Sequence, residues 1–172
     1  MEIRTERLTL RPIGLSDFVT THEYASDPEN TRFMLYLPND SEEETRGFLR
    51  ASEEEWKKPL PADYELAVVF DGTHIGCISL TPDEPRTSAE FGWIINKRFQ
   101  RRGFAYEAAS ALLKYAADNL GIKHFIAHCD SENAGSRGVM EKLGMTLTKE
   151  YGGRRNKLSD EERRECLYEI TV

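Results

Sequence analysis

Residues 90–117 read EFGWIINKRFQRRGFAYEAASALLKYAA, and this stretch decides the fold. Its first part alternates with the period of a β-strand, with Phe91, Trp93 and Ile95 on one side and Glu90, Gly92 and Ile94 on the other. Its last part has apolar residues at helical spacing. These inward positions are Ala105, Ala108, Ala109, Leu112, Leu113, Ala116 and Ala117. The stretch therefore predicts a strand, a basic turn with one glycine, and a helix over residues 102–120.

The turn at residues 100–105, QRRGFA, is expected to bind an anion. The start of a helix leaves backbone N–H groups unpaired and carries the positive end of the helix dipole, which together suit a phosphate. The turn is neither a P-loop nor a G-x-G-x-x-G dinucleotide fingerprint, since it holds a single glycine. The alternative interpretation is a surface arginine pair in front of an ordinary core helix.

The Q-x-x-G-x-A pattern of residues 100–105 resembles the acetyl-CoA pyrophosphate loop of the GNAT superfamily of N-acetyltransferases. The continuation GFAYEA, residues 103–108, is similar to the branch that includes the ribosomal-protein N-terminal (RimJ/RimL-like) acetyltransferases. A second motif, N-x-x-S at 133–136 followed by EKLGM at 141–145, resembles N-x-x-S and E-K-x-G-F in the same enzymes, with methionine in place of phenylalanine. The opening TERLTLRPI at residues 5–13 also resembles this branch. The resemblance covers nearly the whole chain, which we expect to form a single GNAT domain over residues 1–172.

The rest of the chain favours an α/β (α+β) fold. Alternation and turn residues predict strands at 7–12, 64–70, 75–81, 123–129, 145–151 and 166–172, and helices capped by Ser16, Ser41 and Asn133. The crossover through the helix at 102–120 makes strand 123–129 parallel to the strand before it. The resemblance implies the GNAT fold: a mixed, mostly antiparallel sheet with a parallel pair at the cofactor site and helices on both faces. Residues 152–164 are predicted to form a polar, mobile connector. The apolar residues within 30–39 are predicted to pack in the core or to flank the acceptor groove.

Composition narrows the class of protein. The chain has 172 residues and a formal net charge of −7, which argues against a nucleic-acid-binding surface. No apolar run is long enough to span a membrane, and the first residues lack a secretory signal. Cys77, Cys129 and Cys166 have no metal-type spacing and indicate buried thiols in a reducing cytoplasm. Either a monomer or a homodimer fits the sequence.

Acetyl transfer needs few chemical groups. The amine must be neutral to attack, and an α-amine with a pKa of about 8 loses its proton more easily than lysine at about 10.4. The resemblance implies that backbone N–H groups of residues 102–106 bind the pyrophosphate of acetyl-CoA, and that backbone groups of Ile94 and Ile95 bind the pantetheine arm and polarise the thioester. The residues of the phosphate turn are Arg101, Arg102, Gly103, Phe104, Ala105 and Tyr106. No metal is required.

Candidate catalytic groups follow from the same needs. Glu90 is the candidate base, directly or through a water, with a surface carboxylate as the alternative. Ser136 is a candidate acid for the leaving thiolate, or a plain helix-face hydroxyl. Asn133 touches the cofactor arm, caps its helix, or does both. Many GNAT enzymes place a tyrosine acid at the position of Met140, which cannot donate a proton.

Without a tyrosine at that position, the acid is Ser136, Tyr106, a water, or absent. His124 and His128 are predicted to be structural. Tyr168 is predicted to pack in the core or to line the acceptor groove.

The predicted function is an acetyl-CoA-dependent N-acetyltransferase. Its acceptor is a primary amine: a protein or peptide N-terminus, or a small molecule. The alternative is a non-catalytic acyl-CoA-binding module on the same fold, and acceptor and acyl-chain preference stay open.

Overall fold

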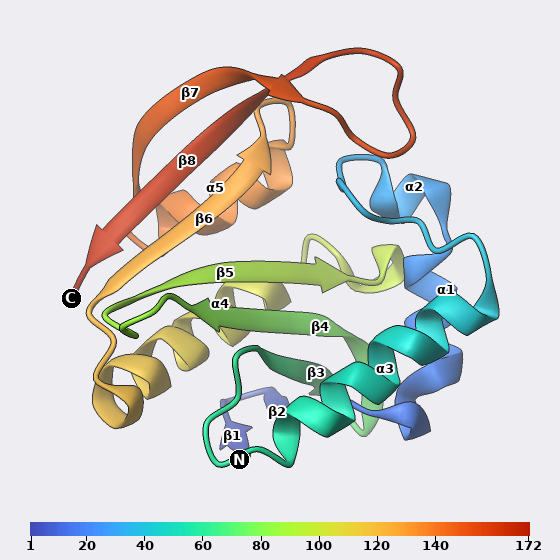
Figure 1. Cartoon of the computed structure of the whole chain (residues 1–172), viewed down its shortest axis with the longest axis vertical. Coiled ribbons are helices and arrows are strands. Elements are labelled where there is room, and N and C mark those ends of the chain that lie inside the picture. Colours follow the sequence, from blue (N-terminus) through green and yellow to red (C-terminus); the bar gives the residue numbers. More distant parts are fainter.

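An eight-stranded mixed sheet forms the centre of the protein (Figure 1). The computed structural model describes all 172 residues. The strands are ordered β1-β2-β3-β4-β5-β6-β8-β7 across the sheet. Their bounds are Ile3–Arg4 (β1), Leu8–Pro12 (β2), Tyr64–Phe70 (β3), Thr73–Pro82 (β4), Ser88–Ile95 (β5), His124–Asp130 (β6), Thr146–Arg154 (β7) and Arg163–Thr171 (β8).

Helices cover both faces of the sheet, as predicted. α1 and α3 lie on one face, and α4 and α5 lie on the other (Figure 1). The helices are Phe18–Ala25 (α1), Pro28–Thr31 (α2), Glu42–Trp56 (α3), Phe104–Tyr115 (α4) and Ala134–Lys142 (α5). Short 3-10 turns at Leu15–Asp17 and Lys97–Phe99 precede α1 and α4.

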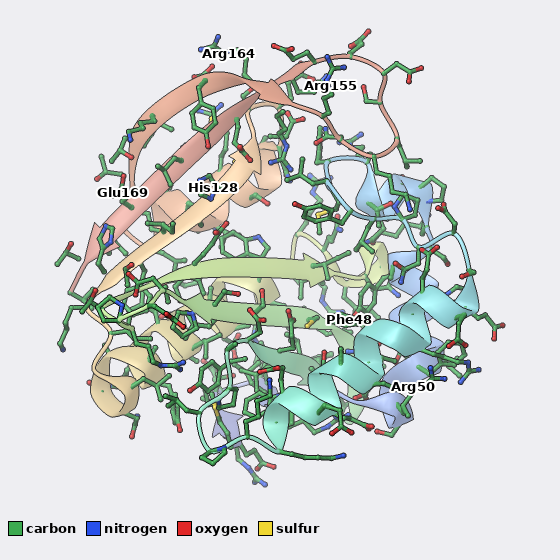
Figure 2. The ribbon with its side chains drawn as sticks, in the orientation of Figure 1. Phe48, Arg50, His128, Arg155, Arg164 and Glu169 are labelled. Atoms are coloured by element: carbon green, nitrogen blue, oxygen red, sulfur yellow. The ribbon has the colours of Figure 1, made fainter.

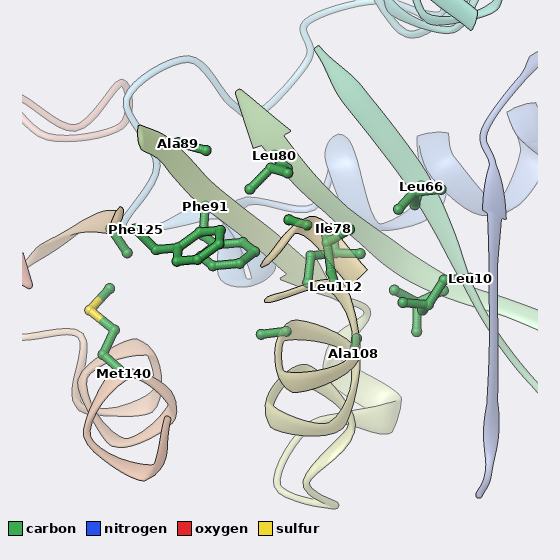
Figure 3. Close-up of a cluster of buried hydrophobic side chains, with 14 of the residues drawn as sticks. Leu10, Leu66, Ile78, Leu80, Ala89, Phe91, Ala108, Leu112, Phe125 and Met140 are labelled. Carbon is green, nitrogen blue, oxygen red and sulfur yellow. The ribbon is translucent and has the colours of Figure 1, made fainter. Parts of the chain in front are cut away.

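The larger of two apolar cores lies between the sheet and helices α4 and α5 (Figure 3). Leu112 of α4 is fully buried there, and the rings of Phe91 and Phe125 stack with their centroids 5.4 Å apart. A smaller core that includes Ile13 and Leu49 fills the space between the sheet and α1 and α3. The apolar stripe of α4 thus packs inward as its spacing predicts.

Removing buried volume from this core should lower stability. Leu112→Ala is expected to reduce the free energy of unfolding by about 2–5 kcal/mol, because apolar contacts are lost and a cavity remains. Guanidinium unfolding of parent and variant measures the difference. A change below about 1 kcal/mol would contradict the packing described for α4.

The parallel pair of strands opens into a fork. β5 and β6 pair only from Ser88↔His124 to Phe91↔Ala127, and their parallel direction confirms the prediction. β5 then continues to Ile95 and β6 to Asp130 without pairing with each other. This fork leaves a gap in an otherwise continuous sheet, and it lies where β5 leads toward α4.

Two local predictions were wrong. The helix expected at 102–120 starts only at Phe104, because Gly103 has a left-handed φ of +82° and ends the preceding turn. The helical segment ends at Leu120 as predicted, and its last turn, Ala116–Leu120, is π-helical. Ser16 is exposed and caps no helix. The buried carboxylate of Asp17 accepts the Gly14 N–H instead, at 3.1 Å.

The region predicted as a mobile connector is held in place. Arg154 and Asn156 are buried, and Arg154 Nε donates to Asn156 Oδ1 at 2.9 Å. Asn156 Nδ2 donates to the fully buried carboxylate of Asp130 at 2.6 Å, and Arg163 Nε also donates to that carboxylate, at 3.1 Å. These contacts fix residues 154–163 against the end of β6.

Cys77, Cys129 and Cys166 are free and buried, as expected of small apolar side chains. None of the helices combines the length and the apolar character needed to cross a membrane. No group of three or more His, Cys, Asp or Glu side chains is placed to hold a metal ion.

Candidate active site

A cavity of about 800 Å³ lies where β5 leads into α4, and it extends along the start of α5 and the segment around α2. Nine residues singled out from the sequence line it, although they come from three separate parts of the chain. They are Ile94, Ile95, Arg101, Gly103, Phe104, Ala105, Tyr106, Asn133 and Ser136. The two remaining candidates, Arg102 and Glu90, do not line it. The structure therefore gathers most of the predicted site around one cavity.

The turn at the start of α4 is fixed to β5 and is exposed at Arg101, Arg102 and Gly103. Gln100 Nε2 donates to the Ile95 carbonyl at 2.9 Å, which ties the turn to the end of the strand. Gly103 caps the helix at φ +82°, a conformation that glycine adopts without strain. The first N–H groups of α4 are thus presented beside the cavity, with the positive end of the helix dipole.

Arg7 and Glu107 brace this turn, and sequence reasoning missed both. Arg7 Nη1 donates to the Arg102 carbonyl at 3.1 Å, and Arg7 Nη2 pairs with Glu107 Oε2 at 2.6 Å. Burial raises the pKa of Glu107, but hydrogen bonds from Thr5 and Arg7 outweigh it, so the pKa is lowered overall. The alternation of residues 7–12 places Arg7 on the polar side of its strand, but gives no sign of this long-range contact.

The side chain of Arg102 does not line the cavity. Its guanidinium carbon lies 4.9 Å from the ring centroids of Phe70 and Phe104, in cation–π geometry. Arg102 accordingly contributes its backbone to the turn, while its guanidinium packs against aromatic rings. Of the arginine pair, only Arg101 lines the cavity.

α5 contributes a capped helix start and a hydroxyl. Asn133 Oδ1 accepts the Ser136 N–H at 3.1 Å, so Asn133 caps the helix as one of the predicted alternatives had it. The Ser136 hydroxyl has no partner within the chain. Met140 is only 1% exposed and packs in the core. Tyr168 is buried too, with its hydroxyl hydrogen-bonded to Arg137 and Glu141.

The segment around α2 forms the opposite wall. Lys97 pairs with Asp27 and Glu29, both at 2.7 Å, and its N–H donates to Asn30 Oδ1 at 2.5 Å. These contacts join α2 to the end of β5. The apolar residues predicted as core or groove flank include Phe33 and Met34, which line the cavity.

The charge lining the cavity is positive although the chain carries a net charge of −7. Arg32, Arg101 and Lys142 line it and form no ion pair. The two lining carboxylates are each ion-paired: Glu29 with Lys97, which also lines the cavity, at 2.7 Å, and Glu132 with Arg163 at 2.6 Å. The cavity thus suits a ligand with several negative charges.

Glu90 lies beside the fork, on the face of the sheet opposite to α4 and α5. Its side chain is 47% exposed, and its Oε1 is 2.8 Å from Nδ1 of His128 on β6. This hydrogen bond raises the pKa of His128, partial burial opposes it, and Glu165 adds to the rise. The sequence interpretation treated His128 as structural. The parallel register of the two strands was the signal that could have paired it with Glu90.

Comparisons with known proteins agree with this geometry. The family described as "Acetyltransferase (GNAT) domain" matches residues 7–146. The uncharacterized N-acetyltransferase YnaD of Bacillus subtilis (strain 168) is 31% identical over 147 residues, which cover 84% of this chain and 82% of YnaD.

Solved structures show the same fold. The crystal structure of a GNAT-family acetyltransferase from Bacillus anthracis has a TM-score of 0.85 and 29% identity, covering 99% of this chain and 98% of that one. RimL, a ribosomal L7/L12 alpha-N-protein acetyltransferase solved with coenzyme A, has a TM-score of 0.89 at 18% identity, covering 100% and 98%. The last likeness concerns the fold alone. With a family match over most of its length, the chain belongs to the GNAT family of acetyltransferases.

Proposed function

We propose that this chain is an acetyl-CoA-dependent N-acetyltransferase that moves an acetyl group to a primary amine. The observation that carries the proposal is the cation-lined cavity of about 800 Å³, which begins at the exposed helix start of α4 and reaches the open end of β5. We further propose that residues 1–172 act as one domain and that the enzyme works in the cytoplasm. The acceptor is the α-amine of a protein or peptide, or the amine of a small molecule.

The residues present fit acetyl-CoA. Backbone N–H groups of residues 102–106 would hold the pyrophosphate, and Gly103 has no Cβ to obstruct its approach. Arg101 and Lys142, both without ion-pair partners, would balance its charge. Backbone groups of Ile94 and Ile95 would bind the pantetheine arm, together with Asn133. When bound, this donor supplies a thioester that an amine attacks.

Two side chains are proposed for proton transfer. Ser136 lines the cavity with a free hydroxyl and would donate a proton to the departing thiolate. Glu90 lies beside the fork on the opposite face of the sheet and would assist deprotonation of the amine, directly or through a neighbouring group. Met140 is buried in the core and has no role in either step.

Binding of coenzyme A tests the cofactor claim. Isothermal titration calorimetry should show saturable binding with one site per chain, and no heat at high micromolar coenzyme A would overturn it. Thiol release from acetyl-CoA should then depend on the acceptor in a panel of serine- and alanine-initiated peptides, spermidine and amino-acid amides. Tight cofactor binding without release by any amine would favour the non-catalytic binding module.

The fold likeness to RimL is the reason to include peptides in that panel. Mass spectrometry of the product shows whether the acetyl group sits on an α-amine or on a side chain. Preference for a peptide over spermidine would identify an N-terminal acceptor, and the reverse would identify a small-molecule acceptor.

A further inference from the structure

The pair formed by Glu90 and His128 stands at the point where the sheet opens. The last ladder pair between β5 and β6 is Phe91↔Ala127. His128 is the next residue on β6, so it stands level with Gly92 at the mouth of the fork. Alternation puts His128 on the same face of the sheet as Glu90, and the 2.8 Å contact between them confirms this. Figure 2 labels His128 on β6 and, on α3, Phe48 and Arg50.

The two ring nitrogens of His128 have different surroundings. Nδ1 contacts the Glu90 carboxylate, which can only accept a hydrogen bond when ionised, so Nδ1 must carry a proton. Nε2 has no partner within the chain, and the side chain is 24% exposed. In the neutral ring, Nε2 therefore has a free lone pair that can accept a proton. A carboxylate that fixes the tautomer of an imidazole in this way is a recurrent arrangement for a base.

His128 also stands closer to the cavity than Glu90 does. Ile94, which lines the cavity, is two residues along β5 from Gly92, or about 7 Å. Glu90 is four residues from Ile94, or about 13 Å. Gly92 has no side chain of its own, and the Ser79 hydroxyl lies 2.5 Å from where its Cβ would stand. An amine that enters the fork at Gly92 would therefore meet a small hydroxyl and not a bulky side chain, within reach of Nε2 directly or through one water.

We propose that His128 is the catalytic base, acting through Nε2, and that Glu90 is a positioning residue that fixes its tautomer. This inference rests on the proposed transfer function. In the step, the amine nitrogen bonds to the thioester carbonyl carbon and the carbon–sulfur bond breaks. The thiolate leaves with the electron pair and takes up a proton, while the proton lost by the amine goes to Nε2 and then to solvent.

Charged groups around the ring favour its protonated form. Glu90 on β5 and Glu165 on β8 raise the pKa of His128, while partial burial and Arg154 on β7 oppose the rise. The raised pKa makes Nε2 a stronger proton acceptor. Activity should accordingly rise with pH as His128 loses its proton, and the acidic limb of the profile should lie above about 6.5, the ordinary value for histidine.

His124 provides a matched control four residues earlier on β6. It shares the strand, the face and the kind of partner, since its Nε2 lies 2.9 Å from Glu169 Oε2. It differs in position, because Ser88↔His124 is a closed ladder pair and no fork is present there. It also uses the other ring nitrogen, so the two histidines should show opposite tautomers.

Nitrogen-15 NMR of the imidazole rings in the unliganded protein tests the geometry without an acceptor. His128 is expected as the Nδ1–H tautomer with a pKa above about 6.5, and His124 as the Nε2–H tautomer. Glu90→Gln should lower the pKa of His128 and leave the tautomer of His124 unchanged. An Nε2–H tautomer for His128, or a pKa that does not respond to Glu90→Gln, would overturn the proposal.

Kinetics with the best amine of the panel test the catalytic role. His128→Gln should lower kcat/KM by about 100-fold and remove the acidic limb of its pH profile, while His124→Gln should leave both unchanged. Glu90→Gln should shift the limb to lower pH. If Glu90 were itself the base, Glu90→Gln would abolish the limb and His128→Gln would preserve it. Calorimetry with coenzyme A separates the two proposals, because His128→Gln should bind it like the parent.

Discussion

Replacing Gly103 with valine is expected to weaken coenzyme A binding by about 10- to 100-fold. Gly103 has a φ of +82°, and a residue with a Cβ pays roughly 1–2 kcal/mol in this region, more when it is β-branched. A strained turn would rotate the first N–H groups of α4 away from the cavity. Each 1.4 kcal/mol lost from binding is a factor of ten in affinity. Isothermal titration calorimetry of the variant measures the change.

Gly121 is the control at the other end of the same helical segment. It too has a positive φ, +73°, and a Cβ there would meet no atom within 4 Å. Gly121 does not line the cavity. Gly121→Val should lower stability by a similar amount and leave coenzyme A binding unchanged. Equal affinities for Gly103→Val and the parent would refute the role given to the turn.

The second large effect is expected at Gly76 on β4. A Cβ there would stand 2.2 Å from the Ile94 carbonyl oxygen and 2.9 Å from the Ile95 Cα. Both are backbone atoms, so no side-chain rotation relieves the overlap, and β4 and β5 must separate. We expect Gly76→Ala to lower the free energy of unfolding by about 3 kcal/mol. Because Ile94 and Ile95 line the cavity, coenzyme A affinity should fall as well.

Gly47 serves as the comparison for this change. It lies inside α3, and a Cβ there meets nothing within 4 Å. Gly47→Ala should raise stability by up to about 1 kcal/mol, since alanine favours a helix over glycine. Chemical unfolding of both variants and the parent measures the two changes in the free energy of unfolding. Parent-like stability for Gly76→Ala would show that the strands yield more easily than described.

Features of the fold that depend on local pattern were predictable from sequence. The alternation along residues 90–95 predicted a strand, and the apolar stripe of α4 predicted a helix. The motif between these two segments predicted the turn. The parallel direction of β5 and β6 followed from the crossover between them. Such patterns are set by neighbours in the chain, so they are visible without coordinates.

Features that depend on distant partners were not predictable. Arg154 and Asn156 look like solvated loop residues, and only the approach of Asp130 turns them into a buried network. Arg7 likewise needs Glu107, a hundred residues away, to act as a brace. His128 became a candidate only when register placed it against Glu90. Tertiary contacts of this kind leave no periodic trace in a single sequence.

The buried thiols have a practical consequence for enzymology. Burial raises the pKa of Cys129 to about 12, and Cys77 and Cys166 are shifted in the same direction. Thiolates are the reactive form, so the folded chain should be nearly inert toward disulfide reagents such as dithionitrobenzoate. In an assay that uses this reagent, the colour formed during turnover would then come from the thiol of released coenzyme A alone. Slow labelling of the protein's own cysteines would measure the rate at which the fold opens and exposes them.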